Sequence, residues 1–94
     1  MKTTQSLSED LHRLIASYHE GSSDLAHLSQ RAETLIEAMR PNLQADAFSM
    51  AMNSVYLIED INALVMDESR EVTVVEQQAI HAQLSVLENL FTPK

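Results

Sequence analysis

The sequence predicts an all-α protein, a compact four-helix bundle (or a three-helix one) around a long central third helix. Glycine and proline are scarce, with one Gly and two Pro among 94 residues, too few for the tight turns of a β-rich fold. Apolar residues make up 45% of the chain, which favours a packed core over disorder. They recur at helical spacing in separate segments. A chain of this length predicts one domain, residues 1–94.

The first helix is expected over residues 7–20. Ser6 followed by Glu9 has the spacing of a capping box, in which each residue satisfies a free N–H group of the other. Gly21, the only glycine, stands where a left-handed residue commonly ends a helix. The apolar stripe of this segment comprises Leu7, Leu11, Leu14, Ile15 and Tyr18.

A second helix is expected over residues 23–39, with Ser22 or Ser23 as its N-cap. Pro41 should end it, because a residue that precedes proline is disfavoured in the α conformation. Its stripe comprises Leu25, Leu28, Ala32, Leu35, Ile36 and Met39.

The third helix is expected over residues 43–66 with Asn42 as its cap, a length of about 37 Å at 1.5 Å per residue. Because apolar residues cover most of its circumference, we expect burial on several sides and a central position, with the first two helices on one side and the fourth on another. The methionines Met39, Met50, Met52 and Met66 are interpreted as core residues. The remaining polar strip comprises Asp46, Ser49, Asn53, Tyr56, Asp60 and Asp67.

The fourth helix is expected over residues 74–91. Thr73 and Glu76 form a second capping-box pattern at its start. Pro93 closes the chain. The apolar stripe comprises Ile80, Leu84, Leu87 and Phe91.

Composition excludes several functions. The formal net charge of −8 disfavours binding to nucleic acid and to anionic membranes, which both need Lys and Arg. The absence of Cys excludes disulfides and thiolate chemistry. The sequence shows no signal-peptide pattern and no apolar run long enough to cross a membrane, so we expect a cytoplasmic protein.

Catalytic and metal-binding patterns are incomplete. Asp24 and His27 lie three residues apart, as in one turn of a metal-binding helix, but bundles that hold carboxylate-bridged metals need four such contributions. The other three histidines are expected on separate polar faces or helix ends, and all four are interpreted as solvated. No nucleophile elbow or phosphate-binding loop is present, and adjacent carboxylates on a helix diverge by about 100°. The sequence therefore predicts no enzyme activity, no cofactor and no metal.

Acidic residues are concentrated in the second half of the chain. Residues 1–40 contain six Asp or Glu and four Lys or Arg, whereas residues 41–94 contain eight and two. Asp67 and Glu68 lie at the C-terminal end of the third helix, where the helix dipole makes a carboxylate unfavourable by roughly 0.3–1 kcal/mol. Stability does not explain this placement. Solubility is one explanation, and Glu71 and Glu76 are favourable near the start of the fourth helix.

The other explanation is a surface that docks a basic protein, with Tyr56 as an amphipathic anchor. Reversal of acidic residues there should slow association and flatten its salt dependence. The predicted docking residues are Asn53, Tyr56, Glu59, Asp60, Asp67, Glu68 and Glu71.

Two segments, "LHRLIASYHEGSSDLAHL" and "IEDINALVMDESREVTVVEQQAI", resemble small helical bacterial immunity proteins of contact-dependent growth inhibition and colicin-type nuclease systems. The resemblance is one of pattern and size over about residues 7–91. It implies a stoichiometric inhibitor that binds one cognate toxin domain, often a cationic ribonuclease, and blocks its active site. Such an inhibitor should be a monomer when free.

Two further hypotheses remain open at the level of sequence. The chain could be a structural or adaptor bundle, such as a co-chaperone, in which a second copy covers the apolar third helix. Sedimentation at several concentrations separates this from a monomeric inhibitor. The chain could also be an enzyme or metal-binding bundle, which the missing ligand sets disfavour and which metal analysis would test.

Overall fold

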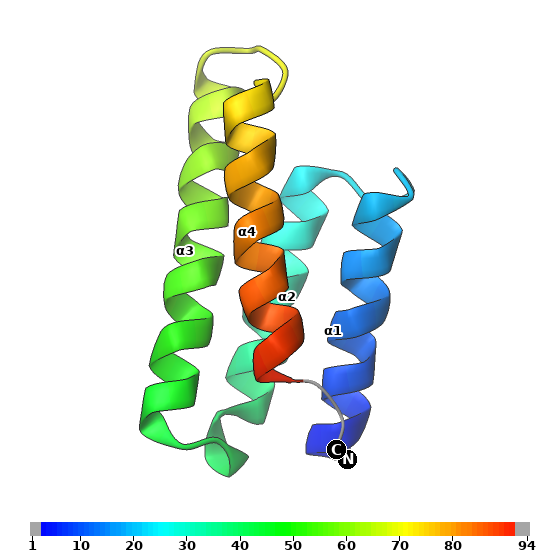
Figure 1. Cartoon of the computed structure of the whole chain (residues 1–94), viewed down its shortest axis with the longest axis vertical. Coiled ribbons are helices and arrows are strands. Elements are labelled where there is room, and N and C mark those ends of the chain that lie inside the picture. The colour runs from blue at the N-terminus through cyan, green and yellow to red at the C-terminus, as the bar shows by residue number, and fades with distance from the viewer. Residues whose placement is uncertain (1–2, 92–94) are drawn as a thin grey trace.

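A computed structural model describes residues 3–91, and this part of the chain is all-α, as the sequence predicts. Consecutive helices run in opposite directions along the long axis of the molecule (Figure 1). A short 3-10 turn, η1, joins the second helix to the third. The elements are α1 (Thr4–His19), α2 (Leu25–Met39), η1 (Arg40–Asn42), α3 (Ala45–Asp67) and α4 (Val74–Leu90).

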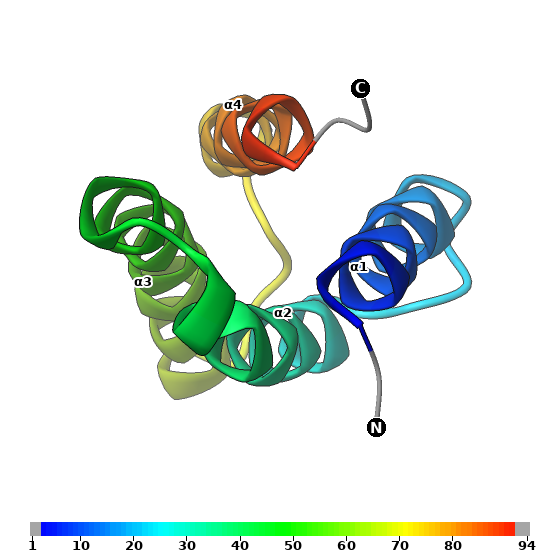
Figure 2. The same ribbon diagram turned by 90° about the horizontal axis from the view of Figure 1, so that it is seen from below.

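The helices are arranged so that α2 lies between α1 and α3, while α4 lies across from α2 (Figure 2). Helix α4 packs along α3 and is also tied to α1 by side-chain hydrogen bonds. The Ser8 hydroxyl donates to the Phe91 carbonyl oxygen at 2.8 Å, and the Tyr18 hydroxyl donates to Gln77 Oε1 at 3.1 Å. These bonds close the bundle between its first and last helices.

The starts of α1 and α2 differ from the sequence prediction. Thr3, not Ser6, caps α1, because its Oγ1 accepts a hydrogen bond from the Ser6 backbone N–H at 3.0 Å. Asp24 caps α2 in place of a serine, and its Oδ1 accepts from the His27 N–H at 2.8 Å. In both helices a neighbouring side chain that also prefers the N-cap position takes it.

Two predicted helix termini are confirmed, the end of α1 before Gly21 and the start of α4 after Thr73. Gly21 follows α1 with φ of +82°, a left-handed conformation that glycine adopts at little cost. Thr73 Oγ1 accepts from the Glu76 N–H at 3.1 Å, and the Glu76 carboxylate accepts from the Thr73 N–H at 3.0 Å, which completes the capping box of α4. Pro93 lies outside the described residues.

Asn42 does not cap α3, and this prediction is wrong. Asn42 belongs to η1, which closes when the Leu43 N–H donates to the Arg40 carbonyl oxygen at 3.1 Å. Helix α3 therefore begins later, with Gln44 as its N-cap and with no side-chain hydrogen bond to the first turn. At its other end Ser69 adopts a left-handed φ of +50°, so this terminus lacks the glycine that follows α1.

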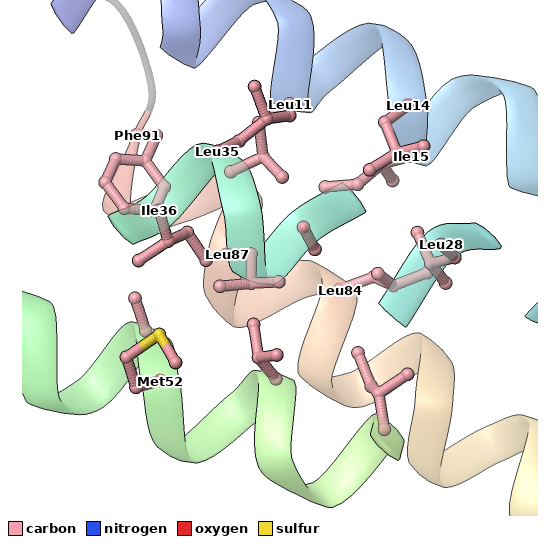
Figure 3. Packing of buried hydrophobic residues seen from close by; sticks show 14 of the residues in the cluster. Leu11, Leu14, Ile15, Leu28, Leu35, Ile36, Met52, Leu84, Leu87 and Phe91 are labelled. Carbon is pink, nitrogen blue, oxygen red and sulfur yellow. The ribbon is translucent and has the colours of Figure 1, made fainter. Parts of the chain in front are cut away.

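All four helices contribute to one core, seen from close by in Figure 3. No buried side-chain nitrogen or oxygen within residues 3–91 lacks a hydrogen-bond partner. The largest fully buried side chains are Leu11, Ile15, Leu28, Leu35, Ile36, Met39, Val55, Ile58, Ile80, Leu84 and Leu87.

The burial of α3 is more one-sided than its composition predicts. Met52 is buried as expected, and Met39 of α2 is buried as well. Met50 and Met66, however, are 52% and 65% exposed, so their assignment to the core is wrong. Helix α3 packs mainly against α2 and α4, which leaves the side turned away from both neighbours open to solvent.

Candidate functional site

The open side of α3 carries an unbroken line of exposed residues at alternating spacings of three and four. This spacing averages 3.5 residues, so the side chains follow one another down a single face of the helix. We call this line the outer seam. It comprises Asp46, Met50, Asn53, Leu57, Asp60, Leu64 and Asp67.

Apolar and polar side chains alternate along the outer seam. Every second position is a large apolar residue that is about half exposed: Met50 at 52%, Leu57 at 49% and Leu64 at 45%. The positions between them are three aspartates and one asparagine. The seam is about 32 Å long at 1.5 Å per residue. Helix α3 contains no Lys or Arg, so no basic residue of its own faces these carboxylates.

The structure places three of the predicted docking residues, Asn53, Asp60 and Asp67, within the outer seam. Tyr56 lies on the same open side of α3 and is 50% exposed. These four side chains share one solvent-facing surface.

Glu59 faces a different way, toward α2. Partial burial raises the pKa of the Glu59 carboxyl from 4.5 to about 7, helped by a hydrogen bond with Glu33 and by the negative charges of Glu33, Asp60 and Glu37. A shared proton thus replaces mutual repulsion between Glu59 and Glu33 at neutral pH and below. Glu59 therefore belongs to the contact between α2 and α3 more than to the outer surface.

The two remaining predicted residues, Glu68 and Glu71, lie in the turn between α3 and α4, which is organised by Arg70. The Arg70 guanidinium donates two parallel bonds to the Glu76 carboxylate, at 2.8 and 2.9 Å, and a third to Glu68. It also donates to the Glu71 carbonyl oxygen at 3.0 Å. Arg70 lowers the pKa of Glu76 to about 2, together with the backbone hydrogen bond from Thr73. Glu68 is thus paired within the chain, whereas the Glu71 carboxylate is exposed.

The sequence suggested that the histidines lie on separate polar faces or helix ends, but two of them are in contact. The rings of His19 and His81 meet edge to face with centroids 4.8 Å apart, and His12 Nε2 lies 3.0 Å from the Phe91 carbonyl oxygen. The spacing of Asp24 and His27 has a plain cause in the N-cap of α2. Among residues 3–91, no group of three or more His, Asp or Glu side chains could hold a metal ion.

Sequence reasoning missed Met50, Leu57 and Leu64 as surface residues, because it assigned every apolar position of this helix to the core. A signal was present in the sequence: these three residues are seven apart, and each is followed three positions later by Asn or Asp. A core stripe would not place an Asp or Asn at every second position of the same line.

The sequence matches no protein family, and comparisons with curated proteins and with solved structures find no match. Within the described residues, none of the helices combines the length and the apolar character needed to cross a membrane.

Proposed function

We propose that this protein binds a basic protein through the open side of α3. The observation that carries the proposal is the composition of that side: half-exposed Met50, Leu57 and Leu64 lie in line with aspartates that no Lys or Arg of α3 opposes. An apolar surface set among carboxylates fits a partner that brings both apolar contacts and positive charge.

Solubility alone accounts for the aspartates but not for the apolar residues between them. A face that served only to keep the protein dissolved would gain from polar residues at all positions. Instead, one large apolar side chain in each of three successive heptads remains about half exposed, and Tyr56 is exposed on the same side. Such patches are typical of surfaces that another protein covers.

The finer proposal is that the partner is a toxin nuclease domain and that this protein is its stoichiometric inhibitor. It is supported by the resemblance of residues 7–91 to immunity proteins and by elementary electrostatics. A nuclease must present positive charge to phosphates, and a carboxylate-rich surface can occupy that charge in place of the substrate. Inhibition by coverage needs no chemistry from the inhibitor.

The test begins with the reading frames that neighbour this gene, searched for one that encodes a domain rich in Lys and Arg. That domain is purified alone and mixed with the protein in stopped-flow measurements. The double variant Asp60→Lys, Asp67→Lys is expected to associate on the order of tenfold more slowly at low salt, with a flatter salt dependence. The matched control, Glu9→Lys with Glu20→Lys, changes the net charge equally at one exposed residue within α1 and one directly after it, and α1 lies across the bundle from α3 (Figure 2).

Equal slowing by both double variants would show that only the overall charge matters, and would contradict a binding face on α3. If the domain is a nuclease, a nuclease assay with the same proteins tests the finer proposal. One equivalent of the wild-type protein should abolish cleavage, and the double variant should inhibit less at the same concentration.

A further inference from the structure

We infer that the outer seam takes a single α-helix of the partner, in which apolar residues alternate with Lys or Arg at spacings of three and four. This inference rests on the proposed function and specifies the chemistry of the segment that the open side of α3 would bind.

The spacing of the outer seam points to a helix as its occupant. Alternating spacings of three and four over three heptads are the pattern by which two helices pack side by side, because knobs of one enter holes of the other. A straight helix drifts from this line by only about 20° per heptad. Each of the seven seam positions from Asp46 to Asp67 is exposed, so the bundle itself buries none of them.

The chemistry of the seam specifies the sequence pattern of that helix. In heptad terms, Met50, Leu57 and Leu64 occupy the a positions and the aspartates with Asn53 occupy the d positions. The a positions call for apolar side chains on the partner. The d positions call for Lys or Arg, whose long apolar stems cover a neighbouring leucine while the charged end reaches a carboxylate.

A second copy of this chain does not satisfy the same seam. In a parallel pair, each d position would face its own counterpart, so Asp60 and Asp67 would meet like charges. In an antiparallel pair, a positions face d positions, so Leu57 would lie against Asp or Asn of the other copy. Either arrangement buries a carboxylate against a like charge or an apolar group, which opposes association and favours a basic partner.

The inference is tested with synthetic three-heptad peptides that are labelled and titrated with the full chain in fluorescence anisotropy. One peptide has Leu at a and Lys at d, for parallel packing, and a second exchanges the two, for antiparallel packing. Each has an isomer of identical composition whose lysines lie at the outward b, c and f positions. We expect at least one seam peptide to bind about tenfold more tightly than its isomer.

Two triple variants locate the site. Met50→Gln, Leu57→Gln and Leu64→Gln together should weaken binding of that peptide about tenfold. Met66→Gln, Val74→Gln and Val75→Gln form the control, because they replace three exposed apolar residues outside the seam and should leave the affinity within about twofold. Far-UV circular dichroism of both variants verifies that the helices remain.

Several outcomes would overturn the inference. Equal binding of a seam peptide and its isomer would show attraction by charge alone, and absence of binding would show that no such helix fits. Equal weakening by the two triple variants, or by neither, would place the peptide elsewhere. Dimerisation of the chain in sedimentation, abolished by Leu57→Gln, would identify a second copy as the occupant. In any of these cases, the proposed function would still be supported by salt-dependent binding of the basic domain. That binding must then be impaired by the double variant Asp60→Lys, Asp67→Lys.

Discussion

Helices α2 and α3 lie side by side and are both rich in apolar residues, but they use them differently. Helix α2 has 15 residues, of which seven are buried, whereas α3 has 23 residues, of which five are buried. The exposed positions of α2 are mostly charged or polar, whereas those of α3 include Met50, Leu57, Leu64 and Met66. The comparison shows that the large apolar residues of α2 are buried in the core, whereas α3 has a second line of apolar residues on the surface.

The two helices also differ at their starts. Helix α2 begins with an Asp24 side chain that binds a free backbone N–H, whereas α3 begins at Gln44 without such a bond. A helix that is neither well capped nor buried all round depends on its inward face for stability. Val55 and Ile58, at the centre of that inward face, are fully buried, and the opposite face is left exposed.

The sharpest test of the comparison is one substitution made in both helices. Leu35→Ala in α2 should lower the free energy of unfolding by about 3 kcal/mol, because the side chain is 2% exposed and a cavity results. Leu57→Ala in α3, at 49% exposure, should change it by less than about 0.5 kcal/mol. Urea unfolding of both variants measures the difference. Similar losses would mean that the outer seam is part of the core after all.

The capping difference predicts changes of opposite sign. Asp24→Ala should lower the free energy of unfolding by about 1 kcal/mol, because the His27 N–H loses its acceptor. Gln44→Ser should raise it by about 0.5 kcal/mol, because a hydroxyl can then accept from the first turn of α3. Thermal unfolding followed by circular dichroism distinguishes the two, and a loss in both variants would contradict the assigned N-cap of α3.

The C-terminal ends of the helices offer a related comparison. Ser69 holds a left-handed conformation that glycine adopts more easily, as Gly21 does after α1. Ser69→Gly should therefore stabilise the protein by up to about 1 kcal/mol, with part of the gain offset by the greater freedom of the unfolded chain. An unchanged midpoint in urea would indicate that this offset is complete.

The contact between α2 and α3 predicts a pH dependence. Because the pKa of Glu59 is raised to about 7, the folded state holds a proton that the unfolded state releases near pH 4.5. Stability from this group is therefore present below pH 4.5 and is lost as the pH rises to about 7. Glu59→Gln should remove this decline and stabilise the protein at pH 8, by less than about 1 kcal/mol because water screens a partly exposed carboxyl.

Glu76 acts in the opposite direction and provides the internal control. Its pKa is lowered to about 2, so its contribution is present above pH 4.5 and is lost as the pH falls toward 2. The free energy of unfolding should be measured for each variant between pH 2 and pH 8. Its pH dependence should become weaker near neutral pH in Glu59→Gln and weaker at acid pH in Glu76→Gln. If Glu59→Gln leaves the pH dependence of the free energy of unfolding near neutral pH unaltered, the role of the contact with Glu33 is contradicted.

The parts of the fold that sequence predicted well are those decided by neighbouring residues. Gly21 ends α1 and Thr73 caps α4 because the required bonds form within one turn of chain. The start of α1 was harder, because Thr3 and Ser6 can both serve as N-caps. The Ser8 hydroxyl also bonds to the Phe91 carbonyl oxygen, a contact between residues 83 apart in sequence that no local pattern contains.

In the candidate site, too, the sequence predicts what neighbouring residues decide and misses what depends on packing between helices. Helical periodicity placed Asn53, Asp60 and Asp67 on one strip, and the structure keeps them together. Periodicity could not tell which apolar positions of α3 have neighbours, since this depends on how many helices surround it. The pairing of Glu59 with Glu33 likewise depends on how α2 packs against α3.

Arg70 has a consequence for the proposed binding face of α3. By holding Glu68 before the turn and Glu76 after it, the guanidinium ties the last turn of α3 to the first turn of α4 in the free protein. The end of the outer seam at Asp67 is therefore already ordered next to this tether. A partner that docked there would not have to immobilise a loose segment, so binding at this end of the seam would cost little conformational entropy.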